Sequence, residues 1–386
     1  MSHEYPKVEI IEESPREGMQ IESVDITVDQ KLELIEMLAD TGLPTIVVGS
    51  FVSPLWTPQM AHIDELVARL KPRDGVAFTA LALNERGRER RKKFTPPLSI
   101  PDETPQTLAH LCDVFVRRNT NRSQRDEIAE WPSIVTSAVA RGATHAGVAI
   151  NAAWGSNWLG PFDQEYRTNM LDEQIDLWRV AGIPVDRVWI GDPMAWNVPD
   201  QVAAQLLAIR ERWPGITRFH LHLHDARGTA LVSAYEALRV LDAECTLVLD
   251  ASVGGMGGCP YGGHGRMTRM IPTEDLVDLL NELGIATGVD IDRLIDVAIR
   301  AEAIVGHPLW GHVAKAGPRP RGERLFPMDL PFIETEHEAQ HFRLGPSVYA
   351  GARSPWSAPI ESPMRPSDTP KGSQLDEPGA TVASGA

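Results

Sequence analysis

The sequence predicts an α/β fold and, within that class, favours a closed (β/α)8 TIM barrel with a proline-rich C-terminal extension. Eight short apolar, β-branched runs recur over about the first 300 residues. Segments of helical period with polar or glycine-rich loops separate these runs, and no internal sequence repeat indicates a solenoid. Eight strand–helix units fit a closed barrel better than an open doubly wound sheet, which remains the alternative.

The predicted strands alternate with predicted helices along the chain. The strands are expected at 8–12, 45–48, 76–83, 113–116, 147–150, 187–190, 218–223 and 246–249. The first helix is expected to begin at a capping box formed by Thr27 and Gln30 and to end before Gly42 and Pro44. Further helices are expected at 127–140, 171–181, 199–209, 229–238 and 273–283.

The composition changes beyond Gly317, where 11 of the 30 prolines lie. We therefore expect a catalytic barrel over residues 1–316 and an extended arm over 317–361 that still carries large apolar side chains. Residues 362–386 have almost none, which predicts a disordered tail.

Composition and charge narrow the class of protein. The 386 residues are 42% hydrophobic and 23% charged, as in ordinary globular proteins. Lys and Arg number 37 against 53 Asp and Glu, and the net charge of -16 argues against nucleic acid as a partner. The three cysteines form no C-x-x-C pair, which favours a reducing compartment. With neither a secretory signal nor a membrane-length apolar run, we expect a cytoplasmic protein with no membrane partner.

Three histidines occupy alternate positions at the end of the seventh predicted strand. Side chains of a strand repeat every two residues, so His220, His222 and His224 share one face. The C-terminal ends of barrel strands form the active-site face. A lone buried histidine is more often structural, but several on one face at this end favour a metal site.

The first predicted strand ends in a charged turn, Arg16 and Glu17 between Pro15 and Gly18. Taken alone, such a turn is an ordinary solvated surface feature. Together with the histidines, Glu17 would complete a site of one carboxylate and two imidazoles, and Arg16 would neutralise an oxyanion.

The segment 254–265 follows the eighth strand and is dense in glycine, which is typical of a mobile lid. Its one thiol is Cys259. A passive small apolar residue is the alternative, but a buried structural role fits such a loop poorly. We interpret Cys259 as a proton donor or acceptor.

These features together resemble the 3-hydroxy-3-methylglutaryl-CoA lyase family, which is related to isopropylmalate and citramalate synthases. The resemblance runs in order over roughly residues 8–310. Its marks are the segments 15–20 (PREGMQ), 50–60 (SFVSPLWTPQM), 117–119 (RRN), 191–192 (GD), 222–225 (HLHD), 257–261 (GGCPY) and 273–276 (TEDL).

The resemblance implies a divalent cation, Mg2+ or Mn2+ before Zn2+, bound by Glu17, His222 and His224. It implies a retro-aldol cleavage of a 3-hydroxy acid, expected to be an acyl-CoA thioester like 3-hydroxy-3-methylglutaryl-CoA. Arg16 would stabilise the enolate and Cys259 would reprotonate it. The remaining expected site residues are Asp192 in the catalytic set and Gln20, Ser50, Asn119, His264 and Arg266 for substrate binding.

The sequence departs from the family pattern at three positions. Glu17 stands where the family has Asp, and the family's catalytic Glu falls on Val47. The segment 264–272 contains no Asn for the metal site and is about two residues longer than expected. Replacement groups would come from His264, Arg266 or Arg269 in that segment, or from the C-terminal arm.

Three interpretations of the function follow. We favour an active lyase, because Arg16, both histidines, Asp192 and Cys259 are all present. The reverse condensation, as in the related synthases, is the second interpretation. The third is a barrel without catalysis that binds a metal or a partner.

A basic run over residues 86–93 follows the third predicted strand and could bind the phosphates of coenzyme A. A solvated helix face is the more common reason for such a run. We also expect a homo-oligomer, specifically a dimer.

Overall fold

The computed structural model describes residues 4–102, 104–261 and 269–325. The chain divides into two compact units, Met1–Gly317 and Pro318–Ala386. The described part of the second unit contains one short 3-10 turn, Gly322–Arg324. Beyond residue 325, the predicted arm and tail lie outside the described residues.

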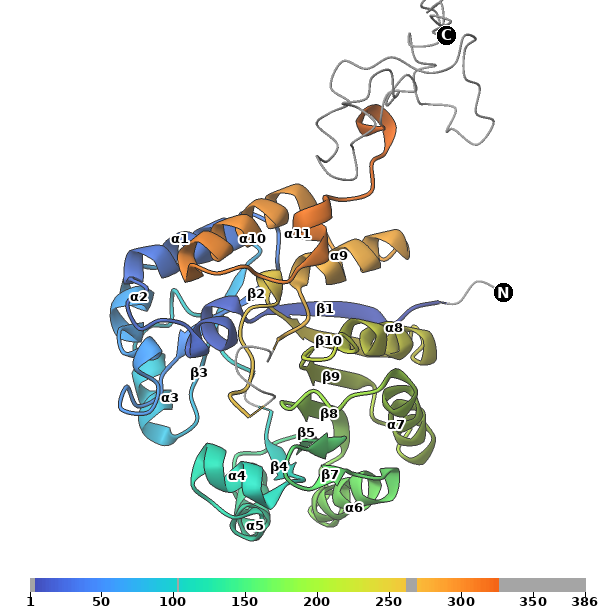
Figure 1. The fold of residues 1–386 in the computed structure, drawn as a ribbon. Helices are drawn as coiled ribbons and strands as arrows, with labels where there is room; N and C mark the ends of the chain where they lie inside the picture. The colour runs from blue at the N-terminus through green and yellow to red at the C-terminus, as the bar shows by residue number, and fades with distance from the viewer. Residues whose placement is uncertain (1–3, 103, 262–268, 326–386) are drawn as a thin grey trace, which may run out of the picture. The chain divides into compact units, whose positions relative to one another are not determined.

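Eight parallel strands form the barrel in the first unit (Figure 1). Around the ring the order is β3-β2-β1-β10-β9-β8-β5-β4, so the first strand of the chain pairs with the last. Among the described residues, only β3 and β4 have no ladder between them. This cyclic order confirms the (β/α)8 barrel and not the open doubly wound sheet. The strands are β1 (Lys7–Glu12), β2 (Thr45–Ser50), β3 (Ala77–Leu81), β4 (Gln106–His110), β5 (Ala146–Asn151), β8 (Val185–Asp192), β9 (Arg218–Leu223) and β10 (Thr246–Ala251); β6 (Gly155–Ser156) and β7 (Gly160–Pro161) form a separate small hairpin.

Helices surround the strands on the outside of the ring (Figure 1). They are α1 (Val28–Ala39), α2 (Ile63–Arg69), α3 (Glu85–Lys92), α4 (Asp113–Thr120), α5 (Gln124–Ala140), α6 (Gln164–Val180), α7 (Pro199–Arg212), α8 (Ala230–Val240), α9 (Thr273–Glu282), α10 (Ile291–Val305) and α11 (His312–Ala316). The predicted capping box is present at α1, where Thr27 and Gln30 each accept a hydrogen bond from the other's backbone N–H.

The predicted strand at 113–116 is wrong. The fourth barrel strand is β4, a few residues earlier, and Asp113–Thr120 forms helix α4. A short apolar run such as Val114–Val116 fits a strand or a helix equally well by periodicity. The helix prevails because the Cys112 side chain caps it, accepting from the backbone N–H of Phe115 at 3.4 Å.

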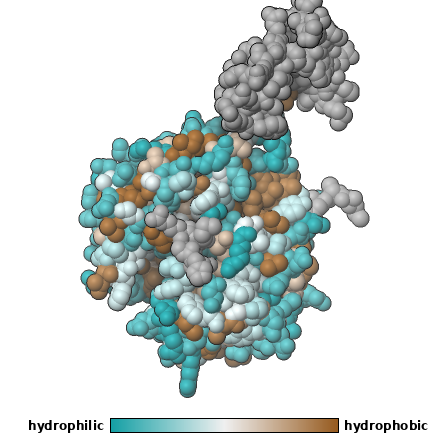
Figure 2. Space-filling view, viewed as in Figure 1, coloured by the Kyte–Doolittle hydropathy of each residue, from teal (hydrophilic) through white to brown (hydrophobic). Residues whose placement is uncertain are grey.

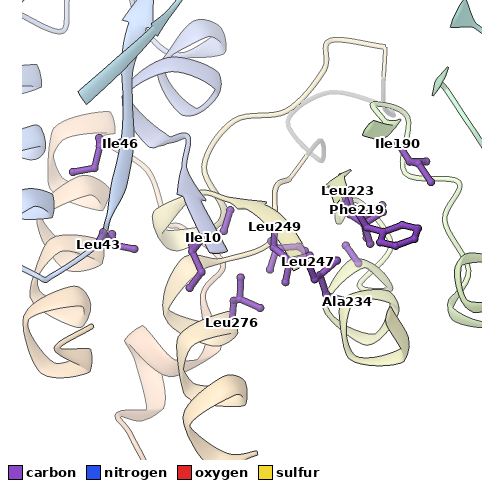
Figure 3. Packing of buried hydrophobic residues seen from close by; sticks show 14 of the residues in the cluster. Ile10, Leu43, Ile46, Ile190, Phe219, Leu223, Ala234, Leu247, Leu249 and Leu276 are labelled. Atoms are coloured by element: carbon purple, nitrogen blue, oxygen red, sulfur yellow. The ribbon is translucent and has the colours of Figure 1, made fainter. Parts of the chain in front are cut away.

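The main hydrophobic core lies between strands and helices. Along β9, Phe219 and Leu223 belong to this core with Leu276 of α9 and Ala234 of α8 (Figure 3). Because side chains alternate along a strand, the intervening His220 and His222 point to the opposite face, the barrel interior. The same alternation therefore builds the core and supplies polar groups to the barrel mouth.

On the face shown in Figure 2, hydrophilic side chains predominate over the described surface and hydrophobic ones form small groups. Within the described ranges, no helix combines the length and apolar character that a bilayer crossing requires.

Candidate active site

The turn after β1 places the first two site residues. Ser14–Gly18 forms a π-helical turn with Pro15 in its first positions, and the N–H of Gly18 donates to the Glu13 carbonyl at 3.1 Å. The turn carries Arg16 and Glu17 at the mouth end of β1, and the Glu17 side chain is buried.

Glu17 and two of the three histidines lie together. One ligand atom from each of Glu17, His222 and His224 falls within 4.8 Å of the others, and all three residues are buried. The Nε2 atoms of the two histidines are 3.1 Å apart, and Glu17 Oε1 lies 3.8 Å from Nε2 of His224. Two nitrogens bound at about 2.1 Å and at right angles to one cation would be about 3.0 Å apart, so the ring pair fits a shared cation.

Asp250, at the mouth end of β10, holds His222 of this pair and also the neighbouring His220. One carboxylate oxygen lies 2.7 Å from Nδ1 of His222 and the other 2.7 Å from Nε2 of His220. The contact at Nδ1 fixes the ring of His222 and leaves its Nε2 lone pair for a cation. The sequence interpretation missed Asp250, although its signal was the same one that identified the histidines, a polar residue that ends an apolar strand.

The Nε2 atom of His224 faces His222 and Glu17, and Nδ1 is its other ring nitrogen. This buried Nδ1 has no hydrogen-bond partner in the described part of the chain. A ring whose Nε2 binds a cation carries its proton on Nδ1, so the pair of nitrogens is consistent with ligation through Nε2.

Burial and neighbouring charges shift the pKa values of the three residues in different directions. Burial opposes ionisation of Glu17, but the charges of Arg16, His222 and His224 together outweigh it and hold the pKa of Glu17 below its usual value. Burial and the neighbouring charge of His222 lower the pKa of His224 to about 3. Burial opposes the charged form of His222, but Asp250 and Glu17 raise the pKa of this ring. At neutral pH Glu17 is therefore a carboxylate and His224 a neutral imidazole, the forms that bind metals, whereas His222 has to give up a proton that its neighbours favour.

Arg16 joins two carboxylates. Its Nε donates to Glu13 at 2.8 Å, and its Nη1 donates to Glu17. Burial opposes the charge, but Glu13 and Glu17 raise the pKa of Arg16, so the guanidinium stays ionised.

The cysteine loop packs against the turn after β1. A Cβ on Gly257, whose φ is +85°, would stand 2.5 Å from the Glu17 carbonyl oxygen, so the close approach requires glycine. Cys259 is buried in a small apolar cluster with Phe115 and Met194, in contrast to the expectation of an open lid. Burial raises the pKa of Cys259 to about 12, and the thiol keeps its proton at neutral pH. Residues 262–268 of the loop lie outside the described residues.

The Asp192 carboxylate binds its own loop. It accepts hydrogen bonds from the backbone N–H groups of Trp196 at 3.0 Å and Asn197 at 2.7 Å, and from the Asn197 side chain at 2.7 Å. The Asn197 amide also donates to the carbonyl of His224 at 2.9 Å. These contacts favour a positioning role, so a catalytic role for Asp192 stays a prediction.

The described substrate-binding candidates lie on three different elements, and their role stays a prediction. Ser50 is buried at the end of β2, and Gln20 is half-buried in the 3-10 turn Met19–Ile21. Asn119 is exposed on the last turn of α4, the helix that follows β4. His264 and Arg266 lie outside the described residues.

The segment 264–272, in which the family pattern expects an Asn, ends beside His224. Beyond the undescribed loop residues, Met270 forms an isolated bridge with His224, and the Arg269 carbonyl accepts from the N–H of Asp225 at 2.5 Å. In the described residues of this segment, a methionine backbone therefore lies against the end of β9.

The basic run on α3 pairs with acids at the surface. Arg88 pairs with Glu85, Arg90 with Asp64, and Lys92 with Glu89. This pattern agrees with a solvated helix face and gives no support to phosphate binding.

A (β/α)8 barrel with a carboxylate and two imidazoles at its mouth defines the class of divalent-metal barrel enzymes. Comparisons with known proteins specify the class further. The model of the HMGL-like family matches residues 7–300. The chain is 33% identical over 321 residues to the (R)-citramalyl-CoA lyase of Chloroflexus aurantiacus, which covers 81% of this chain and 95% of that protein. It is 32% identical to the 3-hydroxy-3-isohexenylglutaryl-CoA/hydroxymethylglutaryl-CoA lyase of Pseudomonas aeruginosa, over 80% of this chain and 97% of that one.

Among solved structures, an HMG-CoA lyase from Acinetobacter baumannii in complex with coenzyme A and 3-methylmalate is similar, with a TM-score of 0.66 and 25% identity. The match covers 84% of this chain and 98% of that chain. The protein belongs to the HMGL-like family, as its sequence motifs predicted. It is a carbon–carbon lyase, and lyases of this family depend on a divalent metal.

Proposed function

We propose that the protein cleaves a 3-hydroxyacyl-CoA thioester related to hydroxymethylglutaryl-CoA or citramalyl-CoA, using Mg2+ or Mn2+. The observation that carries this proposal is the buried cluster of Glu17, His222 and His224 at the mouth of the barrel. The relatives named above act on acyl-CoA substrates of this kind, and one solved relative holds coenzyme A.

Each side chain has a distinct task in this proposal. Glu17, His222 and His224 would hold the cation, which when bound supplies Lewis acidity and a template for the substrate. Arg16 would stabilise the negative charge that develops on the thioester oxygen. Cys259 delivers a proton from Sγ to the carbon of the departing enolate, because its raised pKa keeps the thiol protonated.

The two other interpretations from the sequence are not favoured. The relatives are lyases, which speaks for cleavage over condensation and against a barrel without catalysis. A cytoplasmic location and a dimer remain predictions; the location rests on the three free cysteines.

The test combines metal analysis with a substrate screen. The wild-type protein is loaded with Mg2+ or Mn2+ and assayed for cleavage of 3-hydroxyacyl-CoA thioesters and their free acids. His222→Ala and His224→Ala should each lose bound metal and turnover together. His145→Ala is the matched control, because His145 precedes β5 at the opposite end of the barrel. Full metal stoichiometry in both site variants would refute the ligand set.

A further inference from the structure

The barrel mouth holds more buried carboxylates than a cation needs. Cleavage of a 3-hydroxyacyl thioester requires an acceptor for the hydroxyl proton. Most of the buried carboxylates described here already have tasks, since Glu17 belongs to the ligand cluster, Asp250 is held by two histidines and Asp192 is held by its loop. Glu12 is likewise held, by Ser14, Val253 and Thr273. Glu13 has none of these tasks.

We propose that Glu13 accepts the proton of the substrate hydroxyl, an inference that rests on the proposed function. Its backbone N–H donates to the Ala251 carbonyl at 2.8 Å, which continues the pairing of β1 with β10 through Glu13. By strand alternation, Glu9 and Glu13 then share the face that points into the barrel. The Glu13 side chain is buried and accepts from Arg16 Nε at 2.8 Å. One guanidinium group therefore separates Glu13 from Glu17.

The register of the barrel places Glu13 at the level of Val47. β1 and β2 are parallel, with Ile11 beside Thr45 and Glu12 beside Ile46. One residue past this pair, and one residue past the end of β1, the same register sets Glu13 level with Val47. Val47 is the position where the sequence motif led us to expect a carboxylate. A carboxyl group is thus present at this height of the barrel, carried by the neighbouring strand.

The surroundings of Glu13 suit a group that takes up and returns a proton. Burial raises the pKa of Glu13 to about 7. Among the charged neighbours, Arg16 and His222 lower this pKa and Asp250 raises it. A proton acceptor works best when its affinity for the proton is close to the working pH.

The step balances without a further reactant. The hydroxyl O–H bond breaks, its proton goes to a Glu13 carboxylate oxygen, and the electron pair forms the new carbonyl. The carbon–carbon bond breaks, and its electrons pass to the thioester enolate. The enolate carbon takes the Cys259 proton. The Glu13 proton then restores the thiol through solvent, so no net proton is gained or lost.

The first test is Glu13→Gln, which keeps the size of the side chain and an acceptor for Arg16. We expect kcat to fall by about 100-fold or more, the range for loss of a general base, while KM and the Mn2+ dissociation constant change by less than about threefold. The matched control is Glu9→Gln, which also removes an arginine-paired carboxylate from the inner face of β1, at 2.6 Å from Arg218. This control should keep the wild-type kcat.

A second variant pair moves the carboxyl group from position 13 to position 47 on the neighbouring strand β2. Glu13→Val should lose activity as Glu13→Gln does, and the double variant Glu13→Val/Val47→Glu should recover at least about tenfold of that loss. Circular dichroism and Mn2+ binding establish that each variant is folded and loaded. A folded, loaded double variant without recovery would contradict the shared level of the two positions.

The outcomes separate this inference from the proposed function. A metal-loaded wild-type protein that cleaves none of the thioesters overturns the proposed function and this inference with it. An active wild type whose Glu13→Gln variant keeps kcat within about fivefold overturns the role of Glu13 alone.

Discussion

Replacing Asp250 with Asn tests whether the orientation of His222 controls the metal site. The carboxylate now serves two rings, with one oxygen 2.7 Å from Nδ1 of His222 and the other 2.7 Å from Nε2 of His220. An amide offers oxygen to only one ring. If its NH2 group faces His222, the ring must move its proton to Nε2, the atom needed for the cation. If the oxygen faces His222, the geometry survives but the negative charge is lost.

The expected size of the effect follows from these two orientations. Loss of a partner that orients a metal ligand costs about 10- to 100-fold in metal affinity. We expect about 10-fold where the amide oxygen faces His222 and about 100-fold where the NH2 group does, which corresponds to about 1.4 to 2.7 kcal/mol. Calorimetric titration with Mn2+ at pH 8 measures the affinity, and steady-state kinetics at saturating Mn2+ measure what turnover remains.

The control for Asp250→Asn is Asp176→Asn, which removes an exposed carboxylate that pairs with Arg179 on α6. The control should bind Mn2+ as the wild type does. An Asp250→Asn variant with an Mn2+ dissociation constant within about twofold of the wild type, and unchanged kcat, would refute the argument that Asp250 orients the site.

Three further predictions concern the cysteine loop and the base of α9. Gly257→Ala should lower both thermal stability and Mn2+ affinity, because the new Cβ meets the Glu17 carbonyl at 2.5 Å. Gly182→Ala is the control: Gly182 has a similar positive φ but no atom within 4 Å of a new Cβ, so this variant should lose only the backbone strain of about 1–2 kcal/mol. Equal losses in the two variants would disprove the contact. Cys259→Ser should keep its metal but lose about 100-fold or more in kcat, since a hydroxyl is a weaker acid than the thiol; wild-type turnover in steady-state assays would remove Cys259 from the mechanism. Burial raises the pKa of Glu274 from 4.5 to about 8, so the folded state holds a proton that the unfolded state has lost. The free energy of unfolding of the wild type should therefore fall with rising pH, by about 1 kcal/mol per pH unit relative to Glu274→Gln. Urea unfolding of both proteins from pH 4.5 to 8 measures this difference. Parallel curves of unfolding free energy against pH would contradict the prediction.

Local patterns were sufficient for most of the fold. Strand β9 has the bounds predicted from its alternating histidines, and α1 begins at the capping box read from Thr27 and Gln30. The fourth strand was misplaced because Val114–Val116 is too short for its periodicity to distinguish strand from helix. Its correct assignment depended on Cys112, whose capping contact is not visible as a standard signal in the sequence.

The candidate site was predictable where one strand or one turn carried several of its members. His222 and His224 share a face within a single strand, and Glu17 ends the neighbouring turn, so local spacing and the rule for barrel mouths were enough. Asp250 followed the same rule and was missed. Asn119 was expected in the site from the family resemblance; it lies on an exposed turn of α4, and its role stays a prediction.

The sequence by itself determined the order of strands and helices and the chemical groups that end each strand, because these depend on contacts between residues close in the chain. Only the tertiary structure decided that Asp250 holds two rings of the next strand, that Gly257 lies on Glu17, and that β1 pairs with β2 so that Glu12 lies beside Ile46. These relations depend on register and closure between segments far apart in sequence. Long-range packing sets that register, and no local pattern encodes it.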